Sequence, residues 1–233
     1  MTVPSPLTFV FAIFPGVTQL DVTGPYEVFC RLPGVRVVFA SSAGGAVVTE
    51  HGLAFADSVR LADIEQCDLI CVPGGPGQTE ALGDATFMDG LRRLGLQARW
   101  LTSVCSGSLM LGAAGLIDGR RAACHWAYRD LLSEVGVIPV AERVVRDGDL
   151  ITGGGITAGI DFALAVAAEI AGPQTAQAIQ LMLEYAPAPP FEAGTPETAP
   201  PEVLAAVKAR IEAAVAARGA AMRRAAHRMT SQA

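Results

Sequence analysis

The chain has 233 residues, of which 51% are hydrophobic and 17% are charged, and its formal net charge is −6. This composition predicts one substantial core, and the acidic balance argues against nucleic acid as a partner. With three histidines and no paired Cys/His spacing, the sequence predicts no metal site.

The first half of the chain contains continuous apolar runs that predict buried parallel strands. Residues 7–14 form the first run, which Pro15 and Gly16 end, and a helix is predicted from Thr23-Gly24-Pro25 to about residue 32. In order after it, the same signals predict a strand at 35–40, short hairpin strands within 44–60, a buried strand at 68–72 and a helix at about 86–98.

The segment from Trp100 to Gly112 changes from the period of a strand to the period of a helix at Cys105. Such a junction predicts a nucleophile elbow, here with Cys in place of the usual Ser, crowded by small residues such as Ser106 and Gly107. The N–H groups of the first helical turn are expected to favour the thiolate. The alternative is an inert buried cysteine at a strand end.

The second half of the chain continues the alternation of strands and helices. The predicted elements are a helix around 126–135, a β-hairpin at 144–152 turning at Asp147-Gly148, and apolar helices at 157–171 and 174–185. This order predicts an α/β fold, a three-layer α/β/α sandwich with a mostly parallel central sheet. Active sites of such sheets lie beyond the carboxyl ends of the strands.

The last part of the chain differs in composition from the rest. Residues 186–200 are rich in proline and predict an extended arm, and an Ala-rich helix is predicted from Pro201 to about Arg224. We therefore divide the chain into a catalytic domain, residues 1–185, and an arm with a C-terminal helix, residues 186–233. The second part is expected to pack on the core or on a partner subunit.

The five cysteines are odd in number, none forms a CxxC pair, and the N-terminus lacks a basic region before its first apolar run. These features predict free thiols and a cytoplasmic protein without a membrane partner.

Three further elements are candidates to act with Cys105. Asp21 is either a carboxyl group that donates a proton or a helix cap, and Glu27 is expected to be structural or at an interface. The N–H groups near Gly74-Gly75 and of Ser106 are candidates to stabilise negative charge, although a plain tight turn is the alternative. His125 is either the partner of a Cys–His pair or a packed histidine at a helix start, which we favour.

These stretches together resemble the ThiJ/PfpI superfamily, whose fold is that of class I glutamine amidotransferases and is flavodoxin-like. The resemblance rests on four motifs: Phe14-Pro-Gly-Val-Thr-Gln-Leu-Asp-Val-Thr-Gly-Pro-Tyr-Glu-Val-Phe29, Val72-Pro-Gly-Gly75, Ser103-Val-Cys-Ser-Gly-Ser108 and Thr152-Gly-Gly-Gly-Ile-Thr-Ala-Gly-Ile-Asp161. Within it the chain is similar to the isocyanide hydratase family, notably in Ala123-Cys-His-Trp-Ala-Tyr128, Glu142-Arg-Val-Val-Arg-Asp147 and the tail Leu183-Glu-Tyr-Ala-Pro-Ala-Pro-Pro-Phe191.

The resemblance implies a homodimer, a nucleophile at Cys105, an acid at Asp21 and a position for Ile156 near the active-site helix. It implies hydration of a small-molecule isocyanide to an N-formamide through a thioimidate, without a cofactor. Two departures are Ser106, where the family often has Thr, and the absence of a His directly after the cysteine, which disfavours amidase and protease activities. The alternatives are a glyoxalase-like hydratase, a non-catalytic ligand sensor and a redox sensor.

Overall fold

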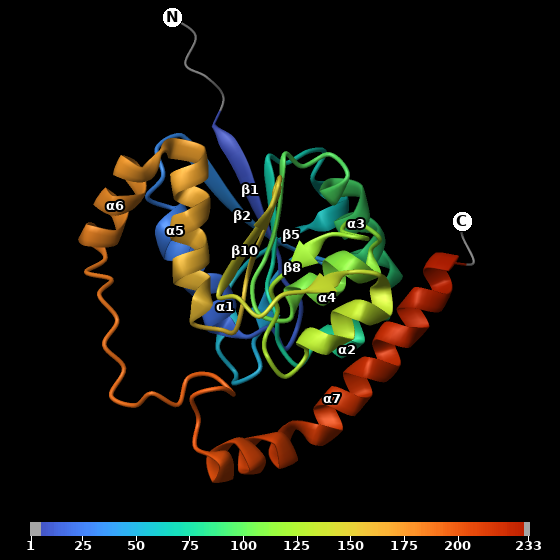
Figure 1. Ribbon diagram of the computed structural model, residues 1–233. Coiled ribbons are helices and arrows are strands. Elements are labelled where there is room, and N and C mark those ends of the chain that lie inside the picture. Colours follow the sequence, from blue (N-terminus) through green and yellow to red (C-terminus); the bar gives the residue numbers. More distant parts are fainter. Residues whose placement is uncertain (1–5, 231–233) are drawn as a thin grey trace, which may run out of the picture.

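The centre of the molecule is a sheet of seven strands, and the computed structural model describes residues 6–230 (Figure 1). Its strands are β1 (Leu7–Ala12), β2 (Val35–Ser41), β5 (Val59–Arg60), β6 (Leu69–Val72), β7 (Trp100–Ser103), β10 (Val144–Asp147) and β11 (Leu150–Gly153). They lie in the order β10-β11-β7-β6-β1-β2-β5. All neighbours are parallel except β10 and β11, the predicted hairpin.

Helices cover both faces of this sheet. On one face lie α1 (Gln19–Phe29), α5 (Ala158–Ala171) and α6 (Pro173–Met182), and on the other lie α2 (Gln78–Ala81), α3 (Ala85–Gly95) and α4 (Gly107–Ala113) (Figure 1). The predicted three-layer α/β/α sandwich is confirmed. The smaller elements are β3 (Val47–Val48) paired with β4 (Ala54–Phe55), β8 (Arg121–Ala122) paired with β9 (Ile138–Pro139), and the 3₁₀ helices η1 (Leu61–Asp63) and η2 (Arg129–Val135).

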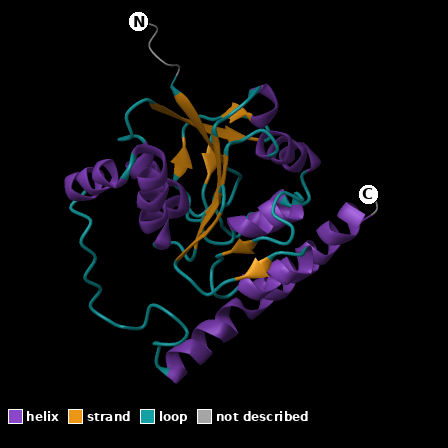
Figure 2. Cartoon of the chain, turned by 45° about the horizontal axis from the view of Figure 1, so that its top comes forward, coloured by secondary structure: helices purple, strands orange, loops and turns teal. Residues whose placement is uncertain are grey.

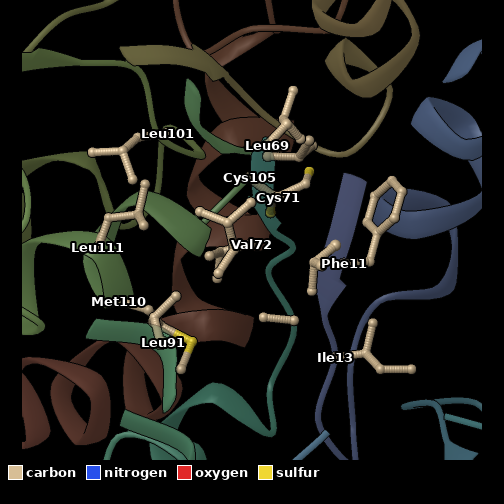
Figure 3. Packing of buried hydrophobic residues seen from close by; sticks show 14 of the residues in the cluster. Phe11, Ile13, Leu69, Cys71, Val72, Leu91, Leu101, Cys105, Met110 and Leu111 are labelled. Carbon is tan, nitrogen blue, oxygen red and sulfur yellow. The ribbon is translucent and has the colours of Figure 1, made fainter. Parts of the chain in front are cut away.

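The layers meet in one apolar core. Strands β1 and β6 are buried on both faces because helices cover each side, which explains why β6, and β1 apart from Thr8, are apolar. Figure 3 shows part of this core, with Leu91 of α3 and Met110 and Leu111 of α4 gathered on one side of Val72. The described cysteines are all free thiols, as predicted.

The register of the central strands brings their carboxyl ends to one level. Val72, the last residue of β6, pairs with Ser103, the last residue of β7, and Thr152 of β11 pairs with the same Ser103. The next residues along each strand therefore emerge together at this edge of the sheet. It is the edge at which the sequence predicts an active site.

The structure corrects three sequence predictions. Helix α1 begins at Gln19 rather than at Thr23, and Pro25 lies inside it. A proline removes one helical hydrogen bond, and this loss is offset because Gly24 and Pro25 pack closely against α5. The predicted helix after Trp126 is only the 3₁₀ helix η2, and the last short strand of residues 44–60, β5, joins the main sheet instead of a hairpin.

The end of the chain forms a long helix that packs on the core. After the extended arm, α7 (Pro201–Thr230) runs along the side of the molecule that carries α2 and α4 (Figures 1 and 2). Ala221, Met222 and Ala225 of this helix are buried in the core, whereas most of its first half is exposed. None of the helices within residues 6–230 has the length and apolarity that crossing a membrane requires.

Candidate active site

Cys105 lies at a sharp turn between β7 and α4. Its φ is 59°, in the left-handed region that residues other than glycine seldom adopt. The turn is possible because Gly107 lies against the carbonyl group of Val72, where a Cβ atom would collide with the backbone. The strand, the bend and the helix have the geometry of a nucleophile elbow.

The thiol of Cys105 is 5% exposed, and its surroundings do not favour the thiolate in the way the sequence predicts. Burial raises its pKa well above the ordinary value, and the nearby Asp21 raises it further. The backbone N–H of Ser106 opposes both by donating to the sulfur. The start of α4 therefore contributes one N–H group, and it lowers the pKa of the Cys105 thiol by less than burial raises it.

Asp21 comes to the site from the first turn of α1 and is completely buried. Its Oδ2 accepts a hydrogen bond of 2.9 Å from the backbone N–H of Gly74. Its Oδ1 is buried and has no hydrogen-bond partner among the described residues. Burial raises the pKa of this carboxyl from 3.8 to about 7, although Gly74 and the thiol of Cys105 each favour the charged form.

Gly74 holds the acid and the elbow together. A Cβ atom on Gly74 would lie 2.7 Å from Ser106 Oγ, 2.8 Å from Ser106 N and 3.0 Å from Asp21 Oδ2. Its carbonyl group accepts a hydrogen bond of 3.0 Å from the N–H of Thr18, just before α1. Only a residue without a side chain fits between these groups, so the close approach of β6, α1 and the elbow depends on this glycine.

Gly75 and Ser106 lie at the same edge of the sheet. The N–H of Gly75 donates to no acceptor among the described residues, and Gly75 has a φ of 141°. The carbonyl group of Ser106 accepts a hydrogen bond of 2.7 Å from the side chain of Gln78, which is completely buried. Gln78 was not among the residues that the sequence singled out.

His125 lies next to the elbow but does not bond to its sulfur. Its backbone N–H donates to the carbonyl group of Cys105 at 3.1 Å, and its Nδ1 accepts from the N–H of Ala127 at 3.2 Å. Burial lowers the pKa of His125, and the cation of Arg218 lowers it further, so the ring is held neutral. No hydrogen bond joins this ring to the sulfur of Cys105 within residues 6–230.

The two remaining candidates lie in different places. Ile156 precedes α5 and lines a hollow of about 310 Å³ together with Cys124, His125 and the arm at Thr195. Glu27 lies on the exposed side of α1 and forms an ion pair of 2.6 Å with Arg31. The structure therefore brings Ile156 close to the elbow region and leaves Glu27 on the surface.

Arg218 is a second residue at this site, besides Gln78, that the sequence analysis missed. It comes from α7, is 3% exposed, and donates through Nη1 to Ser106 Oγ at 3.1 Å and through Nη2 to the carbonyl group of Gly75 at 2.8 Å. A signal was present in the sequence. Arg218 begins an i, i+3, i+4, i+7 pattern that continues through Ala221, Met222 and Ala225, the pattern of a buried helix face.

Comparisons with known proteins agree with this geometry. The model of the DJ-1/PfpI family matches residues 8–169. An isonitrile hydratase of Pseudomonas putida is 54% identical over 194 residues, which are 83% of this chain and 85% of that protein. A glutathione-independent glyoxalase of Caenorhabditis elegans, DJR-1.2, is 28% identical over 67% of this chain and 83% of that protein.

A solved structure shows that the similarity extends beyond the family match. The crystal structure of a ThiJ/PfpI family protein from Pseudomonas syringae superposes with a TM-score of 0.91 and 37% sequence identity. It covers 95% of this chain and 93% of the other, so the arm and α7 fall largely within the matched length. By its matched motifs, its fold and its relatives, this chain belongs to the DJ-1/PfpI family.

Proposed function

We propose that this protein hydrates an isocyanide, R–N≡C, to the N-formamide, with Cys105 as nucleophile and Asp21 as the group that carries protons. The observation that supports this most strongly is the state of Asp21. Its carboxyl group lies beside the thiol, has a pKa of about 7, and keeps Oδ1 without a partner among the described residues. An acid of this pKa can both donate and accept a proton near neutral pH.

The first step forms a covalent bond between Cys105 and the substrate. As the sulfur attacks the terminal carbon of the isocyanide, the thiol proton passes to the Asp21 carboxylate and from it, directly or through a water, to that carbon. The product is a thioimidate, R–N=CH–S–Cys105, in which the thiol proton and the isocyanide have been combined without loss of an atom. The N–H groups of Gly75 and Ser106 stabilise negative charge during this step.

The second step adds water. Asp21, again a carboxylate, accepts a proton from a water that attacks the thioimidate carbon, and passes a proton to the nitrogen. The resulting R–NH–CH(OH)–S–Cys105 then breaks its carbon–sulfur bond and releases R–NH–CHO, while the hydroxyl proton passes through Asp21 to the sulfur and restores the thiol. The name of the Pseudomonas putida relative, an isonitrile hydratase at 54% identity, supports this reaction.

The test is formamide production from p-nitrophenyl isocyanide by the wild type, Cys105→Ala and Asp21→Ala. We expect turnover by the wild type, none by Cys105→Ala, and a strong reduction in Asp21→Ala. In Asp21→Ala, mass spectrometry is expected to find the isocyanide mass added to the Cys105 peptide, because release of the thioimidate is slowed. Full turnover by Cys105→Ala would contradict the mechanism.

Two alternative functions, a glyoxalase-like hydratase and a ligand sensor, make different predictions. Activity on methylglyoxal with none on several isocyanides would favour a glyoxalase-like hydratase, the activity that the name of the Caenorhabditis elegans relative states for that protein. A ligand sensor that regulates transcription would need a DNA-binding module. Residues 201–230 are not such a module themselves, because they form one continuous helix whose second half packs on the core.

We also propose that the enzyme works as a homodimer in the cytoplasm. Large apolar side chains are exposed on and after α6, where Leu181 is 81%, Met182 65% and Phe191 78% exposed. Burial of these side chains between two copies would remove apolar surface from water. Sedimentation equilibrium at micromolar concentration tests this assembly, and a monomer would contradict it.

A further inference from the structure

Arg218 is a buried cation that contacts the elbow from the far end of the chain. Its guanidinium group lies 4.2 Å from the centre of the Tyr128 ring, donates to the hydroxyl of Ser106 at 3.1 Å, and donates to the carbonyl group of Gly75 at 2.8 Å. Ser106 directly follows Cys105 in the sequence, and Gly75 directly follows Gly74. Arg218 therefore contacts both loops from which the N–H groups of the proposed mechanism come.

Within residues 6–230, no carboxylate forms an ion pair with Arg218. None of the ion pairs among the described residues includes it, and its Nε is buried without an acceptor in the same part of the chain. Burying a charge without a counterion costs several kcal/mol. Such a cation is favourable where negative charge develops during the reaction.

The groups that interact electrostatically with Arg218 come from several elements. They are Tyr128 before η2, the thiols of Cys105 and Cys124, Glu80 of α2, and the neutral ring of His125. Of these, Glu80 is exposed and Cys124 lies outside the proposed reaction. In the proposed reaction, negative charge forms and disappears on the Cys105 sulfur, with which Arg218 interacts.

We propose that Arg218 is a positioning residue that stabilises the thiolate of Cys105 and holds the loops of Ser106 and Gly75 in place, so that the site is complete only when α7 is docked. Burial lowers the pKa of the Arg218 guanidinium, yet an arginine in a protein stays protonated, so its positive charge is present at neutral pH. Its positive charge therefore favours the Cys105 thiolate, whereas burial and the Asp21 carboxyl both disfavour the thiolate. The effect on turnover rests on the proposed function, whereas the effect on the thiol does not.

The experiment measures how fast iodoacetamide alkylates Cys105 from pH 5 to pH 10.5, followed by mass spectrometry of the Cys105 peptide. In Arg218→Met we expect the midpoint of the pH profile to rise by about one unit, as removal of one nearby opposite charge predicts. Alkylation below the midpoint then becomes roughly tenfold slower. If Arg218→Met does not fold, Arg218→Gln is used, because its amide retains a donor while the charge is lost.

Two further variants separate charge from structure. Arg218→Lys keeps the charge but not the two-pronged donor, so its midpoint is expected to stay near that of the wild type. Arg223→Met removes an arginine from the exposed side of the same helix, where it pairs with Glu134 at 3.6 Å, and is expected to leave the profile unchanged. An unchanged midpoint in the folded charge-free variant would overturn the proposal. So would a midpoint in Arg218→Lys shifted as far as in Arg218→Met.

Turnover gives an independent readout. Loss of Arg218 is expected to lower kcat for the isocyanide with little change in KM, because its contacts are to the elbow and the Gly75 loop. If the wild type hydrates no isocyanide, the proposed function fails, but the alkylation profiles still decide the role of Arg218. If turnover is present and the profiles of wild type and folded Arg218→Met coincide, only the proposal about Arg218 fails.

Discussion

The carboxyl group of Asp21 accepts a hydrogen bond of 2.9 Å from the backbone N–H of Gly74, which joins the first turn of α1 to the carboxyl end of β6. This bond uses Oδ2 and orients the carboxyl group, so that Oδ1 is left without a partner among the described residues. The acid is thus fixed by one oxygen while the other is available for proton transfer.

Asp21→Asn is expected to change turnover and thiol reactivity in opposite directions. Turnover falls by two orders of magnitude or more, because general acid–base catalysis contributes roughly 10²–10⁴-fold and an amide does not carry the proton. Alkylation of Cys105 at pH 8 becomes faster, because the negative charge that raises the pKa of the thiol is removed. Parallel turnover and iodoacetamide assays measure both, and slower alkylation would contradict the assigned electrostatic effect.

The burial of Asp21 also predicts how stability depends on pH. Its pKa is about 7 in the folded protein and 3.8 ordinarily, so the folded state binds more protons at this group between these values. Stability contributed by Asp21 is therefore present at low pH and lost as the pH rises towards 7, by on the order of 4 kcal/mol.

Urea unfolding at pH 5 and pH 8 tests this dependence. Asp21→Asn is expected to gain stability relative to the wild type at pH 8 and to gain less at pH 5. Asp57→Asn removes an acid from an exposed position and serves as the control. Equal effects of Asp21→Asn at the two pH values would show that the carboxyl does not change its charge in this range.

Gly74→Ala is expected to disrupt the site without removing any catalytic group. The added Cβ atom would lie within 3.0 Å of Ser106 and Asp21, and overpacking of this kind costs about 1–3 kcal/mol. Turnover is expected to fall strongly because the acid and the elbow must separate. Gly194→Ala, where no atom lies within 4 Å of the added Cβ, is the matched control and should match the wild type in urea unfolding and turnover.

His125→Asn is expected to retain most of the turnover. The ring accepts a hydrogen bond from the N–H of Ala127 and is kept neutral by burial, so it does not serve as the base for Cys105. Asparagine offers an acceptor in a similar position. A loss of turnover as complete as that of Cys105→Ala would reassign His125 to the catalytic machinery.

Most of the sheet and the elbow could be predicted from the sequence because their signals are local. The apolar runs of β1 and β6, the Asp147-Gly148 turn and the change of period at Cys105 each involve neighbouring residues. The start of α1 was missed because Pro25 is a strong local signal for a helix start, whereas its packing against α5 is a tertiary effect.

The contacts of Arg218 could not be predicted in the same way. Ser106 is 112 positions away along the chain, and no local pattern indicates which element the buried face of α7 contacts. The contact of Gln78 could not be predicted from local patterns either, because its hydrogen bond to Ser106 spans 28 positions. The candidate nucleophile and acid could be proposed from the sequence and its resemblance, but the residues that contact the elbow depend on how distant elements pack.

The glycines at the carboxyl edge of the sheet also influence the unfolded chain. Gly74, Gly75 and Gly107 allow segments to approach more closely than any side chain permits, and Gly16 and Gly77 do the same beside them. Each glycine loses roughly 0.5–1 kcal/mol more conformational entropy on folding than an alanine would. The extra conformational entropy that glycines lose on folding is therefore concentrated in the loops around Asp21 and Cys105. Burial of apolar side chains in the layers beneath these loops compensates this loss.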